Sequence, residues 1–232
     1  MKRSKYIWIT IAISLAVALL ALYMLPHSTS SALYFEGARL DVPQKYLEKD
    51  ANSFPVIKGL PGLDQTSREM LLVVKAPEVA LSLKKYRPNI DGYSDDLRLR
   101  LTLLSSTELA RYTDPEFFGD IRKGSGSYTD QVIEHDKNRG FVRVYRKIEY
   151  PNSWEVFKQK AEGTLPADLQ SSWIAHCVSS NSPLTSSGRL ALCKSHVLVG
   201  NLAIHFTVSD ENLAQIDEIR AFLRALIVDW SR

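Results

Sequence analysis

The sequence lacks the short motifs that mark most catalytic and nucleotide-binding sites. It contains no HExxH zinc motif, and its one glycine-rich stretch, Lys123-Gly124-Ser125-Gly126, matches neither a P-loop nor the GxSxG turn of serine hydrolases. Neighbouring acids such as Asp95 and Asp96 fall in polar segments, where carboxylates are usually solvated. No spacing of Ser, His and Asp singles out a triad. We therefore expect no catalytic residue, no cofactor and no enzyme activity.

The chain also has little net charge beyond its first residues. The formal net charge is +3, and Lys2, Arg3 and Lys5 account for all of this excess. A domain of balanced charge has no general attraction to phosphate backbones, so we expect no nucleic-acid partner. The basic stretch Arg139, Arg143, Arg146 and Lys147 stands beside acids and is expected to form a mixed-charge outer face.

One long apolar run is present near the N-terminus. Residues 6–25 form 20 consecutive positions without a charge, and Tyr6, Trp8 and Tyr23 stand near the two ends of the run. A helix of this length spans about 30 Å, the thickness of a bilayer core, and aromatic residues favour its two interfaces. The basic residues before the run are expected to stay in the cytoplasm. The run therefore predicts a transmembrane anchor that places the rest of the chain on the other side of the membrane.

The alternative for this run is a cleaved signal peptide. Ser30-Ser31-Ala32 offers small residues for a cleavage site, but the apolar core of a signal peptide has only about 7–15 residues. The length favours an uncut anchor, and both alternatives export the domain. We expect residues 1–25 to form the basic start and anchor, 26–32 a tether, and 33–232 a single domain. The pattern is typical of a bacterial single-pass inner-membrane protein with its C-terminal domain in the periplasm.

The domain alternates between strand-like and helix-like patterns, which predicts an α+β fold with an antiparallel sheet and packed helices. A short helix is expected around Trp154, Phe157 and Ala161, and an amphipathic helix from Leu213 to Trp230 closes the chain. Segment 79–86 fits either a strand or a helix, and 108–120 fits one or two helical turns. The expected strands are 33–42, 70–76, 97–104, 127–136, 140–150, 171–179, 190–199 and 202–208.

The register of the last strands can be predicted around Gly200-Asn201, a two-residue hairpin signal. Pairing across this turn places Val199 opposite Leu202 and Cys193 opposite Val208. If Thr185 centres the preceding loop, Cys177 falls directly opposite Cys193, within reach of a disulfide. An exported compartment is oxidising, so we expect the two cysteines to be bonded.

The same register assigns side chains to the two faces of these strands. Trp173 and Ala175 fall on the apolar face that carries the cysteines, whereas His176, His196 and His205 share the opposite face. His196 is expected directly opposite His205, with His176 diagonal to His196. Three imidazoles could bind zinc or copper or form a pH-sensitive patch. No carboxylate is expected there to orient a ring, so we predict ordinary polar positions and no metal site.

The outline of the domain resembles PsbP-like α/β/α sandwiches. The parts that carry the resemblance are Ala38-Arg39-Leu40-Asp41-Val42-Pro43, an early strand that runs into Val-Pro, and residues 204–230, a late strand followed by the final helix. Members of that family commonly act as binding or assembly modules. The resemblance implies such a role and transfers no catalytic residue.

These patterns together predict a membrane-anchored periplasmic protein-binding module without catalytic activity. An immunity-type protein that neutralises a periplasmic toxin fits this description, and so does an accessory or assembly factor of an envelope complex. A hydrolase with an unrecognised site is the enzymatic alternative. The expected partners are a protein of the envelope and, through the N-terminal helix, the lipid bilayer.

Overall fold

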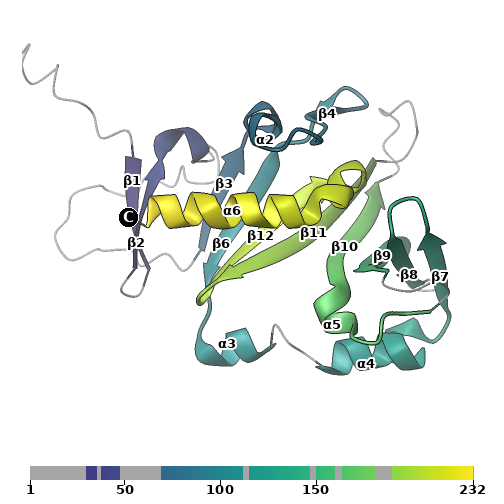
Figure 1. Ribbon diagram of the computed structural model, residues 1–232. Helices are drawn as coiled ribbons and strands as arrows, with labels where there is room; N and C mark the ends of the chain where they lie inside the picture. Colours follow the sequence, from purple (N-terminus) through teal and green to yellow (C-terminus); the bar gives the residue numbers. More distant parts are fainter. Residues whose placement is uncertain are drawn as a thin grey trace, which may run out of the picture.

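The computed structural model describes residues 30–35, 38–47, 69–111, 115–146, 150–159, 164–180 and 190–231. Its main feature is an antiparallel sheet of eight described strands in the order β3-β6-β12-β11-β10-β9-β8-β7 (Figure 1). The expected α+β class with an antiparallel sheet is confirmed. The strands of this sheet are β3 (Glu69–Val74), β6 (Leu97–Leu103), β7 (Gln131–Asp136), β8 (Phe141–Arg146), β9 (Tyr150–Lys158), β10 (Trp173–Ser180), β11 (Leu190–Val199) and β12 (Leu202–Ser209).

Helices and two small hairpins complete the described part of the chain. The hairpins are β1 (Ser30–Phe35) with β2 (Ala38–Pro43), and β4 (Asn89–Ile90) with β5 (Tyr93–Ser94). The helices are α2 (Ala76–Ser82), α3 (Ser106–Arg111), α4 (Pro115–Lys123), α5 (Leu169–Ser172) and α6 (Ile216–Trp230), with 3-10 turns η1 (Gln44–Tyr46), η2 (Gly126–Tyr128) and η3 (Asp210–Gln215). None of the described helices has the length and apolarity needed to cross a bilayer. The predicted anchor, residues 6–25, lies outside the described residues.

The C-terminal strands pair in the predicted register. Val199 lies opposite Leu202, Cys193 opposite Val208, and Cys177 opposite Cys193. Gly200 occupies the turn with a φ of 60°, a left-handed conformation that glycine adopts without strain. The hairpin signal at Gly200-Asn201 therefore predicted the register correctly.

The final helix α6 crosses one face of the sheet (Figure 1). Ile219, Leu223 and Ile227 recur every fourth residue, so they form one stripe, and all three are buried in the larger core together with Phe206 and Leu101. Helix α6 follows the turn η3, whose N-cap is Ser209. The Ser209 hydroxyl donates 2.9 Å to the buried carboxylate of Asp95.

A second, smaller core lies on the opposite face of the sheet. Val142 and Val144 belong to this core, whereas the alternating residues Phe141 and Tyr145 contribute to the larger one. Since neighbouring residues of a strand point to opposite faces, the two cores are on opposite sides. Helix α4, the turn η2 and helix α5 each supply one residue of the small core, which consists of Ile121, Tyr128, Val142, Val144, Phe157 and Leu169.

The helix expected around Trp154, Phe157 and Ala161 is wrong. Residues 150–158 form strand β9, paired with β8 and β10 on its two sides, and Ala161 lies outside the described residues. Trp154 and Val156 face the larger core, and Phe157 faces the smaller one. The period of the segment is therefore two, and both of its faces are buried. Cross-strand pairing on both edges decided the conformation.

The face assigned to Trp173 is also wrong. A register shift between Trp173 and Ala175 inserts an extra residue into β10 relative to β9. Ala175 remains in the larger core as expected, but Trp173 packs against the smaller core on the opposite face. The ambiguous segment 79–86 contains the end of α2, and segment 108–120 contains parts of α3 and α4.

Candidate functional site

The three histidines occupy the predicted positions on one face of the sheet. His196 lies opposite His205 with their ring centres 6.1 Å apart, and His176 lies opposite Lys194, diagonal to His196. The rings nevertheless do not gather as metal ligands. Among the described residues, one group of three potential ligands has its atoms within 4.8 Å of one another, and it consists of Cys177, Cys193 and Asp210. Its cysteines are bonded to each other, so this group is not a metal site either.

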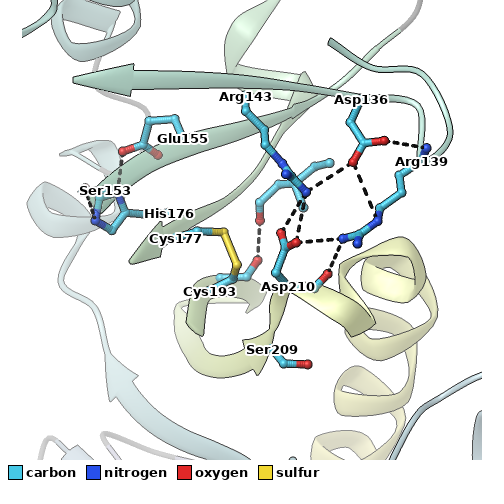
Figure 2. The surroundings of a disulfide bond; sticks show 12 residues. Asp136, Arg139, Arg143, Ser153, Glu155, His176, Cys177, Cys193, Ser209 and Asp210 are labelled. Carbon is cyan, nitrogen blue, oxygen red and sulfur yellow. Dashed lines mark hydrogen bonds and ion pairs between the residues drawn. A yellow bond between two sulfur atoms is a disulfide. The ribbon is translucent and has the colours of Figure 1, made fainter. Parts of the chain in front are cut away.

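His176 turns toward β9, where a buried carboxylate meets it (Figure 2). Glu155 is only 3% exposed and lies 2.6 Å from Nδ1 of His176. The carboxylate also accepts hydrogen bonds from Nε1 of Trp173 at 2.8 Å and from the hydroxyl of Tyr128 at 3.5 Å. Burial, and secondly the charge of Glu155, raise the pKa of the Tyr128 hydroxyl well above its usual range, so this group stays a donor. The expectation that no carboxylate orients a histidine on this face is wrong.

Ser153 completes a chain of three polar side chains. Its hydroxyl lies 3.3 Å from Nε2 of His176, on the side of the ring opposite Glu155. Nucleophile, base and orienting carboxylate follow one another in the order used by serine hydrolases. Acyl transfer also needs a site that holds the substrate and donors for the oxyanion. Ser153 does not line the groove that the described residues form on this face.

His196 takes no part in the contacts of Ser153, His176 and Glu155 and packs against an aromatic side chain instead. The indole of Trp173 stacks on its ring with centres 5.0 Å apart, in the position that the bulge of β10 gives it. Burial, and then the charges of Arg220 and His205, lower the pKa of His196 to about 4. The ring is therefore uncharged at neutral pH. His196 is thus part of the packing rather than the ordinary polar position that the sequence predicted.

We call the part of the same face formed by β3, β6, β12 and β11 the open face. Arg98, Arg100 and Lys194 are exposed on it, and Leu71 has an exposed fraction of 37%. A groove of about 300 Å³ follows these strands, lined by Leu71, Arg98, Leu99, Arg100, Lys194, His205, Phe206 and Thr207. Among the residues that the structure describes, no carboxylate lines it. Among the described residues the guanidinium groups of Arg98 and Arg100 and the ammonium group of Lys194 form no ion pair.

The opposite face carries the disulfide and a partly buried charge network (Figure 2). Cys177 and Cys193 are bonded, with their Cα atoms 4.0 Å apart, so the predicted pairing is confirmed. Beside it, the Asp210 carboxylate accepts from Arg139 at 2.8 Å and from Arg143 at 3.0 Å. Burial lowers the pKa of Arg143, but Asp210 and other neighbours outweigh it and leave this pKa above its usual value. These arginines do not form the expected outer face.

Sequence reasoning missed Glu155 and Ser153 for one reason and the arginine–aspartate network for another. Glu155 and Ser153 fell in a segment interpreted as helical, so they were not placed on the histidine face. The alternation of Trp154 and Val156 with Glu155 was the available signal. The contact between Arg143 and Asp210 joins residues 67 apart in sequence, so no local sequence pattern predicts it.

Comparison with known proteins finds similarity in shape only. No protein-family model matches the chain, and no curated protein matches it in sequence. Smlt3025, an immunity protein of the Stenotrophomonas maltophilia type IV secretion system, is 11% identical with a TM-score of 0.47, over 88% of this chain and 93% of that one. The iron-regulated outer membrane lipoprotein FrpD of Neisseria meningitidis is 11% identical with a TM-score of 0.39, over 87% and 92%. With both TM-scores below 0.5, neither similarity is evidence for a function of this chain.

Proposed function

We propose that the chain is a non-catalytic protein-binding module of the bacterial cell envelope. The apolar residues 6–25 hold it in the inner membrane, and the domain lies in the periplasm. The open face is its binding surface. The single observation that supports this assignment is the set of exposed side chains Arg98, Arg100, Lys194 and Leu71, held across four hydrogen-bonded strands. A surface with cations, an apolar residue and a fixed backbone suits recognition of another protein.

Two roles are compatible with such a module. An immunity-type protein masks a toxic enzyme delivered into the periplasm, and an assembly factor binds a subunit of an envelope complex. We favour the first role because a masking protein needs a rigid surface and an anchor in the compartment where the toxin acts. The buried core under α6 and the disulfide Cys177–Cys193 provide the rigid support.

Photo-crosslinking in intact cells tests both the surface and the role. A photoreactive amino acid is placed at Leu71, on the open face, and in a second variant at Val228, on α6. These positions are 37% and 44% exposed, so they are matched in accessibility. We expect a discrete adduct from position 71 and none from position 228. A toxin in the adduct supports the immunity role, a structural envelope protein supports the assembly role, and an adduct from position 228 alone contradicts the assigned surface.

A hydrolase is the second candidate, because Ser153, His176 and Glu155 have the contacts of a catalytic triad. A fluorophosphonate probe, which labels activated serines, distinguishes it from the binding module. The binding module predicts no labelling of the full chain. A hydrolase predicts labelling that disappears in both Ser153→Ala and His176→Ala and persists in the control Ser125→Ala. This result would show that the protein is a hydrolase and not a binding module.

A further inference from the structure

The cations of the open face form a spaced array. Arg98 and Arg100 are two residues apart on β6, which separates them by about 7 Å along the strand. Thr207 of β12 lies opposite both Arg98 and Lys194, so Lys194 stands two strands away from Arg98, about 10 Å across the sheet. The sheet hydrogen bonds fix the backbone of all three residues.

Among the residues whose side chains the structure describes, the array has no ion-pair partner, unlike several other exposed cations of the domain. Glu155, a carboxylate on this face of the sheet, is buried and holds Trp173 and His176. Elsewhere, partly exposed basic residues have acidic partners within the chain, and these include Arg39, Lys45, Lys75, Arg87 and Lys158. Cations this close repel one another, and an anionic ligand would relieve the repulsion.

The groove between these cations has an apolar part. Leu71 lines it together with the basic side chains, whereas the side chains of Leu99 and Phe206 belong to the larger core on the other face. A hollow that combines spaced cations with one exposed apolar side chain fits an irregular protein segment, whose side chains can enter it. A flat bilayer surface reaches protruding groups rather than the floor of a groove, and balanced charge over the domain gives no wide attraction to lipid headgroups.

We infer that the open face binds an acidic segment of the partner protein. Carboxylates of that segment pair with Arg98, Arg100 and Lys194, and an apolar side chain beside them packs on Leu71. The inference rests on the proposed function and adds the chemistry of the partner. It requires carboxylates about 7 to 10 Å apart, which alternate residues of an extended segment supply.

A peptide titration tests this pairing. The probe is a fluorescent peptide of alternating Glu and Leu, and the protein is the full chain in nanodiscs of uncharged phosphatidylcholine. We expect saturable binding that weakens as salt is raised, because exposed charges are screened. The double reversal Arg98→Glu with Arg100→Glu should weaken binding by at least about tenfold, whereas the matched reversal Lys85→Glu with Arg224→Glu should leave it unchanged. A Lys–Leu peptide should bind the first double variant only.

Several results would overturn the inference. These are no binding of the acidic peptide, equal binding by both double variants, or loss only in the matched control. If vesicles of phosphatidylglycerol bind through Arg98 and Arg100 and the peptide does not, the ligand is a lipid. If Arg98→Glu with Arg100→Glu does not fold, the Gln substitutions take its place. If position 71 still forms its crosslink in the double variant, the proposed binding function stands. Only the inference that the partner supplies an acidic segment is then rejected.

Discussion

Cys177 of β10 and Cys193 of β11 lie directly opposite each other and are bonded, which ties two central strands together under the start of η3. The bond closes a loop with a sequence separation of 16. In the chain-entropy model, a loop of this size stabilises a fold by about 3 kcal/mol. Both sulfur atoms are fully buried, so packing adds to the effect.

The first prediction concerns this bond. Cys177→Ala with Cys193→Ala should lower the free energy of unfolding by about 3 kcal/mol, measured by urea denaturation of the detergent-solubilised chain. The reductant-treated wild type should lose a similar amount. Thiol labelling of denatured, unreduced protein should find no free cysteine, and labelling of both cysteines would contradict the bond.

The second prediction concerns pH. The pKa of His196 is lowered from 6.5 to about 4 by burial first and then by Arg220 and His205. Between these values the unfolded chain binds a proton that the folded chain does not, so stability is complete above pH about 6.5 and falls as the pH drops toward about 4. The total loss is at most about 3 kcal/mol.

Urea midpoints between pH 7 and pH 4 measure this dependence. His196→Gln should flatten the curve over that range, because glutamine does not titrate. Thr207→Val, on the same face of the sheet, removes no titratable group and should keep the wild-type slope. A wild-type slope in the His196→Gln variant would mean that other groups cause the acid sensitivity.

The third prediction concerns the charge network beside the disulfide. Arg143 contacts both Asp136 and Asp210, and its side chain is 13% exposed. Removing Arg143 leaves the two largely buried carboxylates to share Arg139, so Arg143→Met should cost about 2 kcal/mol. The exposed pair of Arg39 and Asp41 provides the comparison, and Arg39→Met should cost less than about 1 kcal/mol. Equal costs in the two variants would show that the network does not stabilise the fold.

The fourth prediction concerns the N-terminus. We expect the 20-residue apolar run at 6–25 to remain in the mature protein as an anchor. The intact mass of the chain from the membrane fraction should then include these residues. A mature chain that begins near Leu33, in the soluble fraction, would mean that the segment is a cleaved signal peptide.

Local patterns were sufficient where a turn or a stripe decided the structure. Gly200-Asn201 fixed the register of β11 and β12, and the spacing of Ile219, Leu223 and Ile227 fixed the buried side of α6. The disulfide followed from centring the loop before β11 on Thr185. These features depend on residues close in sequence, which a single chain displays directly.

The candidate site depends on strand pairings between segments that are distant in sequence, which no local pattern predicts. The bulge at Trp173 moved the indole to the histidine face, and the pairing of β9 with two neighbours made a strand of a segment with a helix-like spacing. The array of Arg98 and Lys194 needs β12 between β6 and β11. Such neighbours are set by the tertiary arrangement, and no local pattern specifies them.

Complementation of a deletion strain tests the central claim, that the chain acts by binding through its open face. One allele carries Arg98→Glu with Arg100→Glu, and the other carries Ser153→Ala with His176→Ala, each checked for wild-type abundance in the membrane fraction. We predict that the first allele fails to restore the wild-type phenotype and that the second restores it. Restoration by the first allele and failure of the second, at equal abundance, would contradict the account and point to catalysis at Ser153.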